Sequence, residues 1–206
     1  NLMGMQQAFK TTNIDSGTRW TVNDVAGKPL YTWDSRGQMV QNTYDELQRP
    51  VSVLLCTEHD PLSGTSCSLC LSGGKIIVEK TVYGTDAAKN NIGQIAEQYD
   101  QSGKTEIESY DFKGNPLQTT KKFAQEYKNY ISWDDATIQQ FNNLTIEQFN
   151  QSHTYDALNR PLTQKMPDNS IIEHTYNEAG LLETVKKDAQ TYVSNINYNE
   201  KGQRTA

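Results

Sequence analysis

The chain has 206 residues, a formal net charge of -6 at pH 7 and a mean hydropathy of -0.76. Acidic and basic residues are interspersed, so no Lys/Arg stripe is present to neutralise phosphates, which argues against a nucleic-acid-binding surface. No apolar run reaches the length of a membrane span, and no signal peptide is present. Only 35% of the residues are hydrophobic, yet 11 tyrosines are too many for a disordered chain, so we expect a thin layer with two wetted faces.

A short motif recurs along the chain: an aromatic residue, then Asp or Asn, two further residues and usually Gly. In chain order the copies are Trp33-Asp34 with Gly37, Tyr44-Asp45, Tyr99-Asp100 with Gly103, Tyr110-Asp111 with Gly114, Tyr155-Asp156, Tyr176-Asn177 with Gly180, and Tyr198-Asn199 with Gly202. Gln48 and Asn159 stand at the Gly position of the two copies without Gly, and residues 23–30 form a degenerate copy. Asp34 and Asp45 are 11 residues apart, and Asp156 and Asn177 are 21 apart, about twice that step.

This period predicts a β-hairpin turn at each copy, because a strand of roughly five or six residues and a short turn fill the step. The Asp or Asn side chain is expected to accept a hydrogen bond from the N–H two residues on, while Gly supplies a positive φ. Pro50, Pro116 and Pro161 fit strand starts, where a missing N–H is tolerated. The tyrosine should end its strand, with its ring over a cross-strand neighbour and its hydroxyl near water.

Alternating stretches rich in β-branched and aromatic residues predict strands over 75–83, 171–176 and 192–198, with an unmarked turn at 166–170. We expect 56–72 to be an inserted loop and 123–153 to be an irregular insertion, either a loop or a short helix. The fold class predicted is therefore all-β, a single region over 1–206 of antiparallel hairpin repeats. Because the chain opens on Asn1, we expect an internal piece of a longer protein.

These copies resemble the YD repeats of Rhs proteins. Residues 24–38 (DVAGKPLYTWDSRGQ), 110–117 (YDFKGNPL) and 155–183 are similar to the repeat shell of bacterial insecticidal toxin complexes, in their B/C components. The resemblance implies a large curved or spiralling sheet forming a hollow shell, which encloses a C-terminal toxin polypeptide. It implies as partners the remaining repeats of the shell, that polypeptide and a translocation-channel component, in a secreted or cell-surface bacterial protein.

In that family the chemistry lies in a self-cleaving segment after the repeats, and we find no such segment here. The expected function is therefore that of a structural wall without enzymatic activity. The alternative is an extracellular adhesion or carbohydrate-binding repeat protein, with the aromatic residues on a sugar-binding face. A glycosidase-like pair of carboxylates is disfavoured because every repeat Asp has the same turn context. His153 and His174, without a nucleophile motif, fit ordinary strand positions.

One further set of residues has metal-ligand spacing. Cys56 and His59 are three residues apart, as are Cys67 and Cys70, which is the pattern of a small Cys₃His zinc site. The competing interpretation is a variable loop with free thiols or a Cys67–Cys70 disulfide. Zinc is the one cofactor that the sequence raises, and no other is expected.

Overall fold

The computed structural model describes residues 9–56 and 75–205 of the chain. Strands β1 to β14 form one sheet whose hydrogen-bonded order follows the chain, and β15 and β16 form a separate antiparallel pair. In the part described, β1 and β14 each have one neighbour within the sheet, so the sheet is open. The fold class predicted from the sequence, an all-β array of antiparallel hairpins, is confirmed.

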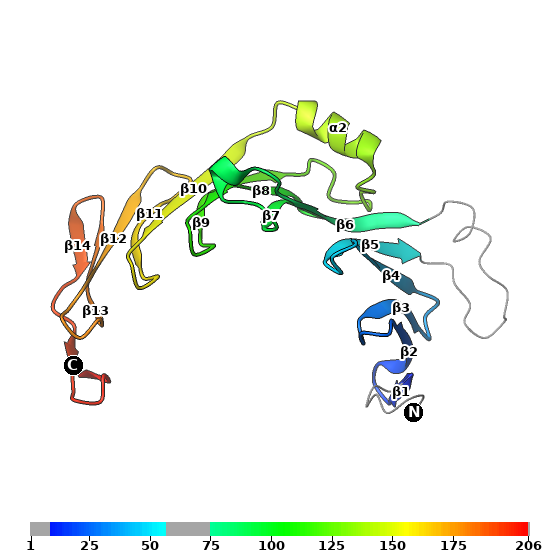
Figure 1. Cartoon of the computed structure of the whole chain (residues 1–206), viewed down its shortest axis with the longest axis horizontal. Coiled ribbons are helices and arrows are strands. Elements are labelled where there is room, and N and C mark those ends of the chain that lie inside the picture. Colours follow the sequence, from blue (N-terminus) through cyan, green and yellow to red (C-terminus); the bar gives the residue numbers. More distant parts are fainter. Residues whose placement is uncertain (1–8, 57–74, 206) are drawn as a thin grey trace. The chain divides into compact units, whose positions relative to one another are not determined.

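The residues divide into two compact units. The first contains five successive hairpin strands, most of a sixth and the only α-helix of the described chain, and Figure 1 shows these strands following one another. Its elements are β1 (Lys10–Asn13), β2 (Gly17–Asn23), β3 (Pro29–Asp34), β4 (Met39–Tyr44), β5 (Pro50–Cys56), β6 (Ile76–Tyr83) and α2 (Asp135–Asn143). Strands β7 (Ile95–Asp100) and β8 (Gly103–Tyr110) contribute residues to both units.

A small apolar cluster lies on one face of β3, β4 and β5. Trp33 pairs with Met39 across β3 and β4, and Met39 pairs with Cys56 across β4 and β5, so the three side chains point to the same face. Met39 and Cys56 are buried, and Tyr31 stacks on Trp33 with ring centroids 5.8 Å apart. This single-layer core explains the low hydrophobic content, because a sheet with two wetted faces has little interior to fill.

A second aromatic cluster holds the inserted segment against the first unit. Trp133 is fully buried, and its ring lies 5.1 Å from that of Tyr99 and 5.2 Å from that of Phe141 on α2. The Trp133 indole donates to the carbonyl oxygen of Asp100 at 2.9 Å, and its backbone N–H donates to Ile77 at 2.9 Å. The insertion is therefore packed on the sheet by an aromatic anchor.

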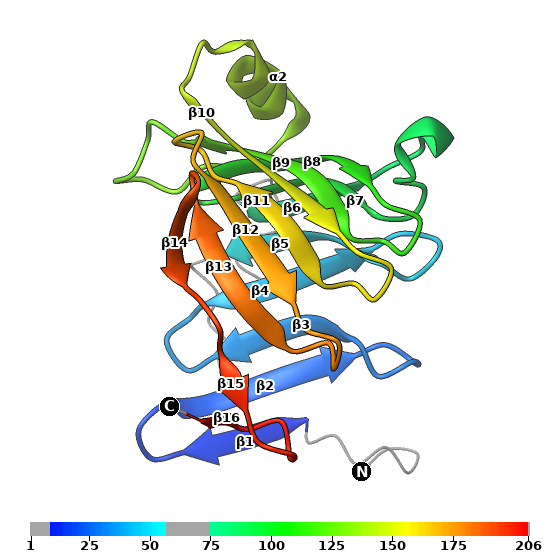
Figure 2. The same ribbon diagram turned by 90° about the vertical axis from the view of Figure 1, so that its left-hand side faces the viewer.

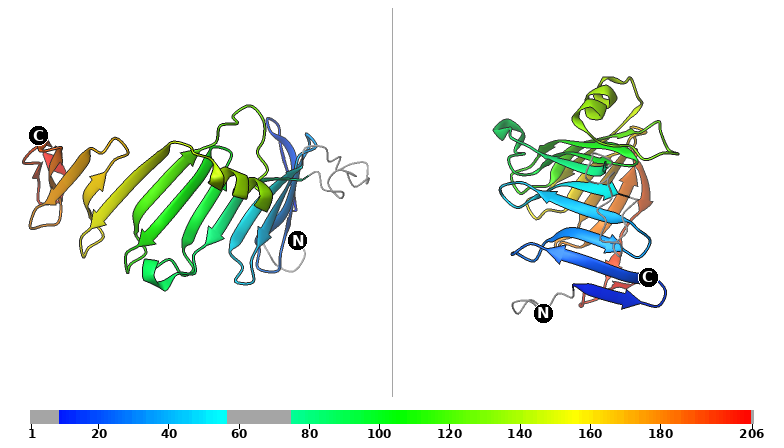
Figure 3. Two further views of the ribbon diagram at one scale, coloured as in Figure 1. Left: turned by 90° about the horizontal axis from the view of Figure 1, so that it is seen from above. Right: turned by 90° about the vertical axis from the view of Figure 1, so that its right-hand side faces the viewer.

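The second unit contains the hairpins toward the C-terminus. Figure 2 and the left view of Figure 3 show strands β10 to β13 running side by side in alternating directions. Its elements are the 3₁₀ turn η1 (Ala87–Lys89), β9 (Pro116–Phe123), β10 (Gln148–Tyr155), β11 (Pro161–Lys165), β12 (Ile171–Tyr176), β13 (Leu182–Lys187), β14 (Gln190–Val193), β15 (Asn197–Tyr198) and β16 (Arg204–Thr205).

The irregular insertion is shorter than predicted. Strand β9 continues to Phe123 and β10 begins at Gln148, so parts of 123–153 belong to regular strands. The helix lies at Asp135–Asn143, where Asp134 caps its N-terminus by accepting from the Thr137 N–H. The predicted loop at 56–72 lies, after Cys56, outside the described residues.

The strand predicted over 192–198 is interrupted. Strand β14 ends at Val193 and β15 begins at Asn197, because Asn195 between them adopts a positive φ of 52° that breaks the extended backbone. The predictions for 75–83 and 171–176 are confirmed by β6 and β12. None of the helices in the described ranges is long and apolar enough to cross a membrane.

Candidate functional site

The repeat turns share one geometry, which Asp156 illustrates. Its backbone N–H donates to the carbonyl of Arg160 at 3.0 Å, closing the turn. Its Oδ1 accepts from the N–H of Leu158 at 2.8 Å and from the N–H of Arg160 at 2.9 Å. The same closing bond, between 2.8 and 3.1 Å, occurs at Asp24, Asp34, Asp45, Asp111, Asn177 and Asn199. The Asp and Asn side chains at these positions accept backbone N–H groups and so cap the turns.

The fourth residue of each such turn has a left-handed backbone. Asn159 has φ of 64° and Gln48 has φ of 61°, so both stand in for glycine at the cost of backbone strain. The glycines at this position have φ between 71° and 86°, namely Gly27, Gly37, Gly114, Gly180 and Gly202. Asn169 has φ of 66° in the turn at 166–170, which confirms the unmarked turn predicted there.

The copy at Tyr99-Asp100 departs from this geometry. Strand β7 ends at Asp100 and β8 begins at Gly103, which leaves a two-residue turn. Asp100 Oδ1 accepts from the N–H groups of Ser102 and Gly103, and Tyr99 is buried against Trp133. Trp33, likewise, belongs to the apolar cluster of the first unit. These two copies match the motif in sequence. Their turns lie at the other edge of the sheet from the remaining repeat turns, and their aromatic residues pack into clusters.

Hairpin turns of consecutive strands alternate between the two edges of a sheet. The turns after Tyr110, Tyr155 and Tyr176 follow β8, β10 and β12, so in the second unit they lie along one edge, which we call the repeat edge. Asn115 there donates to Asn159 Oδ1 at 3.1 Å, which joins two adjacent turns. The structural repeat is therefore two strands, close to 21 or 22 residues, and twice the step first read from the sequence.

Four repeat tyrosines bond their repeat to the one before it. The hydroxyl of Tyr176 donates to the carbonyl of Pro161 at 2.9 Å, the first residue of the preceding hairpin's return strand. The hydroxyls of Tyr44, Tyr110 and Tyr198 make equivalent bonds of 3.0, 2.6 and 2.7 Å to Pro29, Ile95 and Leu182. Beyond the expected position of the hydroxyl near water, each of these four groups donates to a backbone carbonyl. The hydroxyl group distinguishes tyrosine from phenylalanine at this position, because it reaches a backbone acceptor.

Burial raises the pKa of the Tyr44, Tyr110, Tyr155 and Tyr176 hydroxyls above their ordinary value, so these groups remain protonated donors. A cation from the preceding turn covers two of these rings. The Arg160 guanidinium lies 4.3 Å from the centroid of Tyr176, and Lys28 Nζ lies 5.4 Å from that of Tyr44. Arg160 also pairs with Asp156 at 2.6 Å, so one side chain links a turn cap to the next tyrosine.

Replacing Tyr176 with Phe is expected to lower the free energy of unfolding by about 0.5–1 kcal/mol, because the ring contacts stay and one hydrogen bond is lost. Urea denaturation followed by circular dichroism measures the change. Tyr192 is 63% exposed and has no such bond, so Tyr192→Phe is the matched control and should have no effect. An equal effect of both substitutions would contradict the role of the hydroxyl.

The turn caps also predict a pH dependence. The pKa of Asp45 and Asp156 lies below the ordinary 3.8 chiefly because the backbone N–H groups of Arg49 and Arg160 donate to them, and that of Asp111 is lowered first by the Asn115 side chain. Groups with a depressed folded-state pKa stabilise the fold above their unfolded-state pKa, and this stabilisation is lost as the pH falls through the folded-state value. We expect the urea concentration at the unfolding midpoint to be constant near neutral pH and to decrease as the pH falls below 3.8.

The triple variant Asp45→Asn, Asp111→Asn and Asp156→Asn tests whether these carboxylates cause the pH dependence of stability. The amide oxygen retains the cap, as at Asn177 and Asn199, but does not titrate. Its urea midpoint should fall less steeply in acid than that of the wild type. If the urea midpoints of the variant and the wild type decreased equally at acid pH, groups other than these three carboxylates would cause the loss of stability.

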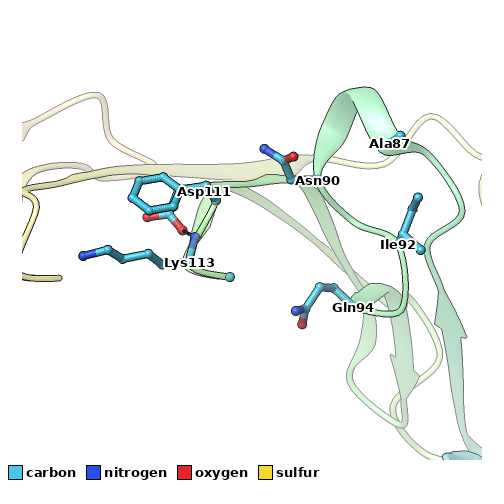
Figure 4. Close-up of a pocket in the computed structure, with 8 residues that line it drawn as sticks. Ala87, Asn90, Ile92, Gln94, Asp111 and Lys113 are labelled. Carbon is cyan, nitrogen blue, oxygen red and sulfur yellow. Dashed lines mark hydrogen bonds between the residues drawn. The ribbon is translucent and has the colours of Figure 1, made fainter.

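A groove of about 450 Å³ opens at the repeat edge of the second unit. In Figure 4, Asn90 and Gln94 come from the loop between β6 and β7, whereas Asp111 and Lys113 come from the turn between β8 and β9. Phe112 beside them is 84% exposed. Asp111 is occupied as a turn cap, so the groove offers no paired acid and base.

The proposed metal ligands fall mostly outside the structure described. His59, Cys67 and Cys70 lie outside the described residues, while Cys56 ends β5, is 2% exposed and is disulfide-bonded. Within residues 9–56 and 75–205, no three His, Cys, Asp or Glu side chains gather closely enough to hold a metal ion. His153 and His174 lie within β10 and β12, each with a buried Nδ1 that has no hydrogen-bond partner.

Together, the sheet, the turn caps and the tyrosine bonds define a protein built from antiparallel β-hairpin repeats, four of which bond through a tyrosine to the preceding hairpin. No profile of a known protein family matches the chain, and no curated protein matches it.

Solved structures of toxin complexes do match. The crystal structure of TcdB2-TccC3-Cdc42 is 26% identical over 95% of this chain, with a TM-score of 0.78, and that of TcdB2-TccC3 is 25% identical over 96%, with a TM-score of 0.79. The Photorhabdus luminescens Tc holotoxin pore, carrying a TccC3 mutation, is 26% identical over 96%, with a TM-score of 0.77. The chain spans 9% to 10% of the length of these proteins. The resemblance to the repeat shell of toxin complexes is confirmed.

Proposed function

We propose that this chain is a segment of wall in a toxin-encapsulating shell of the Rhs/YD-repeat type. The observation that carries the proposal is the likeness of 95% of the chain to TcdB2-TccC3, at a TM-score of 0.78. The repeat edge supplies a physical means, because contacts such as the Tyr176 hydroxyl bond and the Arg160 cation over its ring join neighbouring hairpins of the sheet. Its partners would be the other repeats of the shell and an enclosed toxin polypeptide, with a translocation-channel component beyond them.

The wall would act by exclusion and not by catalysis. The repeat carboxylates of the described chain accept backbone N–H groups as turn caps, in the shared turn and in the shorter turn at Asp100, so they are occupied by the turns. Secretion fits the disulfide at Cys56, since disulfides persist in oxidising compartments. Tyr31, Trp33, Tyr99 and Trp133 are committed to packing, and the solved structures that match are those of toxin complexes, so the shell is favoured over the adhesion alternative.

Limited proteolysis of the full-length protein that carries this segment tests the proposal. The polypeptide C-terminal to the repeats should resist protease in the wild type and become sensitive when the wall is loosened by Trp133→Ala. Tyr127→Ala, in the same segment but 82% exposed, is the control and should keep the protection. A C-terminal polypeptide that is digested as fast in the wild type as after denaturation would refute encapsulation.

Zinc at Cys56, His59, Cys67 and Cys70 remains a separate proposal. A cysteine in a disulfide lacks the thiolate that zinc requires, so the metal would bind only the reduced protein. Metal analysis after reduction and dialysis against zinc should then find one equivalent, which Cys56→Ser abolishes. Reduced wild-type protein without stoichiometric zinc would remove the site.

A further inference from the structure

Two histidines occupy equivalent places in successive repeats of the second unit. His153 lies two residues before Tyr155 in β10, and His174 lies two residues before Tyr176 in β12. Because side chains alternate along a strand, each histidine shares a face of the sheet with its tyrosine. Both rings are half-buried, and in each the Nδ1 atom is buried without a hydrogen-bond partner in the part of the chain described. A buried polar atom without a partner is unusual, and here it recurs at one position of the repeat.

The neighbours of His153 on this face offer its ring no negative charge. Its cross-strand partner in β11 is Gln164, and its ring stacks on that of Tyr155 with centroids 6.1 Å apart. On the other side, β9 places Lys121 on the same face, opposite Phe149. The lysine carries the same sign of charge as a protonated imidazole, so it does not favour that form.

His174 has a similar environment. Its cross-strand partner in β13 is Val185, and Lys187 lies on the same face two residues further along that strand. The Arg160 guanidinium covers the ring of Tyr176, at 4.3 Å from its centroid. Both charged groups are cations, so a positive imidazole between them gains no compensating charge.

The acids around this face have other partners or positions. Asp156 and Asp168 lie 2.6 and 3.9 Å from the guanidinium and the ammonium just described. Asp111 caps its own turn by accepting two backbone N–H groups. Glu183 lines a groove beside β15. The geometry therefore supplies the two histidines with neighbours suited to the neutral form of the ring.

Protonation changes what the buried nitrogen needs. A neutral imidazole can carry its hydrogen on Nε2, whereas a protonated ring carries a hydrogen on both nitrogens. The second hydrogen would sit on the buried Nδ1, where no acceptor is present among the described residues, and the added charge would be partly removed from water. In an unfolded chain both nitrogens are hydrated. The unfolded chain therefore takes up these protons more readily than the folded unit.

We propose that His153 and His174 make the second unit sensitive to mild acid, because their protonation loosens β10 to β13. Histidine changes its charge between about pH 5 and pH 8, so the stabilisation is complete above this range and is lost as the pH falls through it. The turn caps do not contribute there, because hydrogen bonds to their carboxylates hold the pKa of Asp111 and Asp156 below 3.8. This acid sensitivity is a property of the unit itself and does not depend on encapsulation.

Amide hydrogen exchange in the full-length protein that carries this segment tests the proposal. Exchange in β10 to β13 is compared at about pH 7.5 and about pH 5.5, after correction for the intrinsic pH dependence of amide exchange, with β2 to β5 as the internal reference. Opening of β10 to β13 should increase at the lower pH by about tenfold relative to the reference, the change that one unit of differential proton affinity gives. An equal response of the two groups of strands would overturn the proposal.

The double variant His153→Asn and His174→Asn shows whether the imidazoles cause this response. Asn42 stands at the equivalent position before Tyr44 in the first unit, where its amide donates to a backbone carbonyl at 3.1 Å, so asparagine suits the repeat. The variant should match the wild type at about pH 7.5 and lose the excess opening at about pH 5.5. Excess opening of the wild-type size would overturn the role of the histidines.

Two further variants guard this comparison. Gln164→Asn changes an uncharged neighbour on the same face and should retain the excess opening in acid; its loss there would contradict an origin in the imidazoles. If the asparagines weaken the unit at neutral pH, His153→Gln and His174→Gln take their place. The glutamine variant should then show no excess opening in acid, and an excess equal to that of the wild type would overturn the proposal.

Discussion

Replacing Trp133 with Ala is expected to lower the free energy of unfolding by about 3–5 kcal/mol, the largest effect of any single substitution considered. Trp133 is fully buried between Tyr99 and Phe141, and its indole N–H bonds to the Asp100 carbonyl at 2.9 Å. The alanine variant loses the ring contacts, leaves a cavity and leaves the Asp100 carbonyl without its indole donor. Urea denaturation followed by circular dichroism measures the loss.

Hydrogen exchange locates the effect of the same substitution. Amides of the inserted segment and α2 should exchange much faster in the variant, because Trp133 is their main anchor to the sheet. Tyr127→Ala is the control, because Tyr127 is 82% exposed and removing it should change stability by less than about 0.5 kcal/mol. Unchanged protection of α2 in Trp133→Ala would contradict the anchoring role.

Replacing Gly180 with Ala is expected to cost about 1–2 kcal/mol, because an L-residue is strained at a φ of 78°. An added Cβ would also lie 3.0 Å from Arg160 Nη1, displacing the guanidinium that covers Tyr176. Thermal or urea denaturation gives the difference from the wild type.

Two further substitutions separate backbone strain from crowding. Gly180→Asn should cost less than Gly180→Ala, because Asn tolerates the left-handed region and Asn159 already occupies the equivalent position at φ of 64°. Asn159→Gly should leave stability unchanged or raise it. If Gly180→Ala were neutral, the repeat turn would not need a left-handed residue, and the shared turn geometry would lose its explanation.

The turn residues were predictable because their physics is local. An Asx cap, a left-handed fourth position and a proline at the strand start depend on neighbours within five residues, so Asp156, Asn159 and Pro161 carry the prediction themselves. The order of the strands in the sheet could be predicted from these turns, since short turns join strands that are neighbours in the sheet. The likeness to toxin-complex repeats rested on the same residues and agrees with the solved structures.

Contacts between distant residues were not predictable in this way. The bond from Tyr176 to Pro161 spans 15 residues, and the contact of Trp133 with Tyr99 spans an insertion, so no local pattern encodes either. Tyr99-Asp100 has the motif but turns in two residues, because packing of Tyr99 beneath Trp133 outweighs the local turn preference. The side chains that share one face of the sheet could be assigned only from the register of each strand pair, which a bulge shifts by one residue.

An electron cryomicroscopy reconstruction of the full-length protein carrying this segment tests the central claim most directly. It is expected to show β1 to β14 within the wall of a hollow shell that surrounds enclosed density. A reconstruction in which these strands belong to a separate globule, with no enclosed volume beside them, would contradict the account.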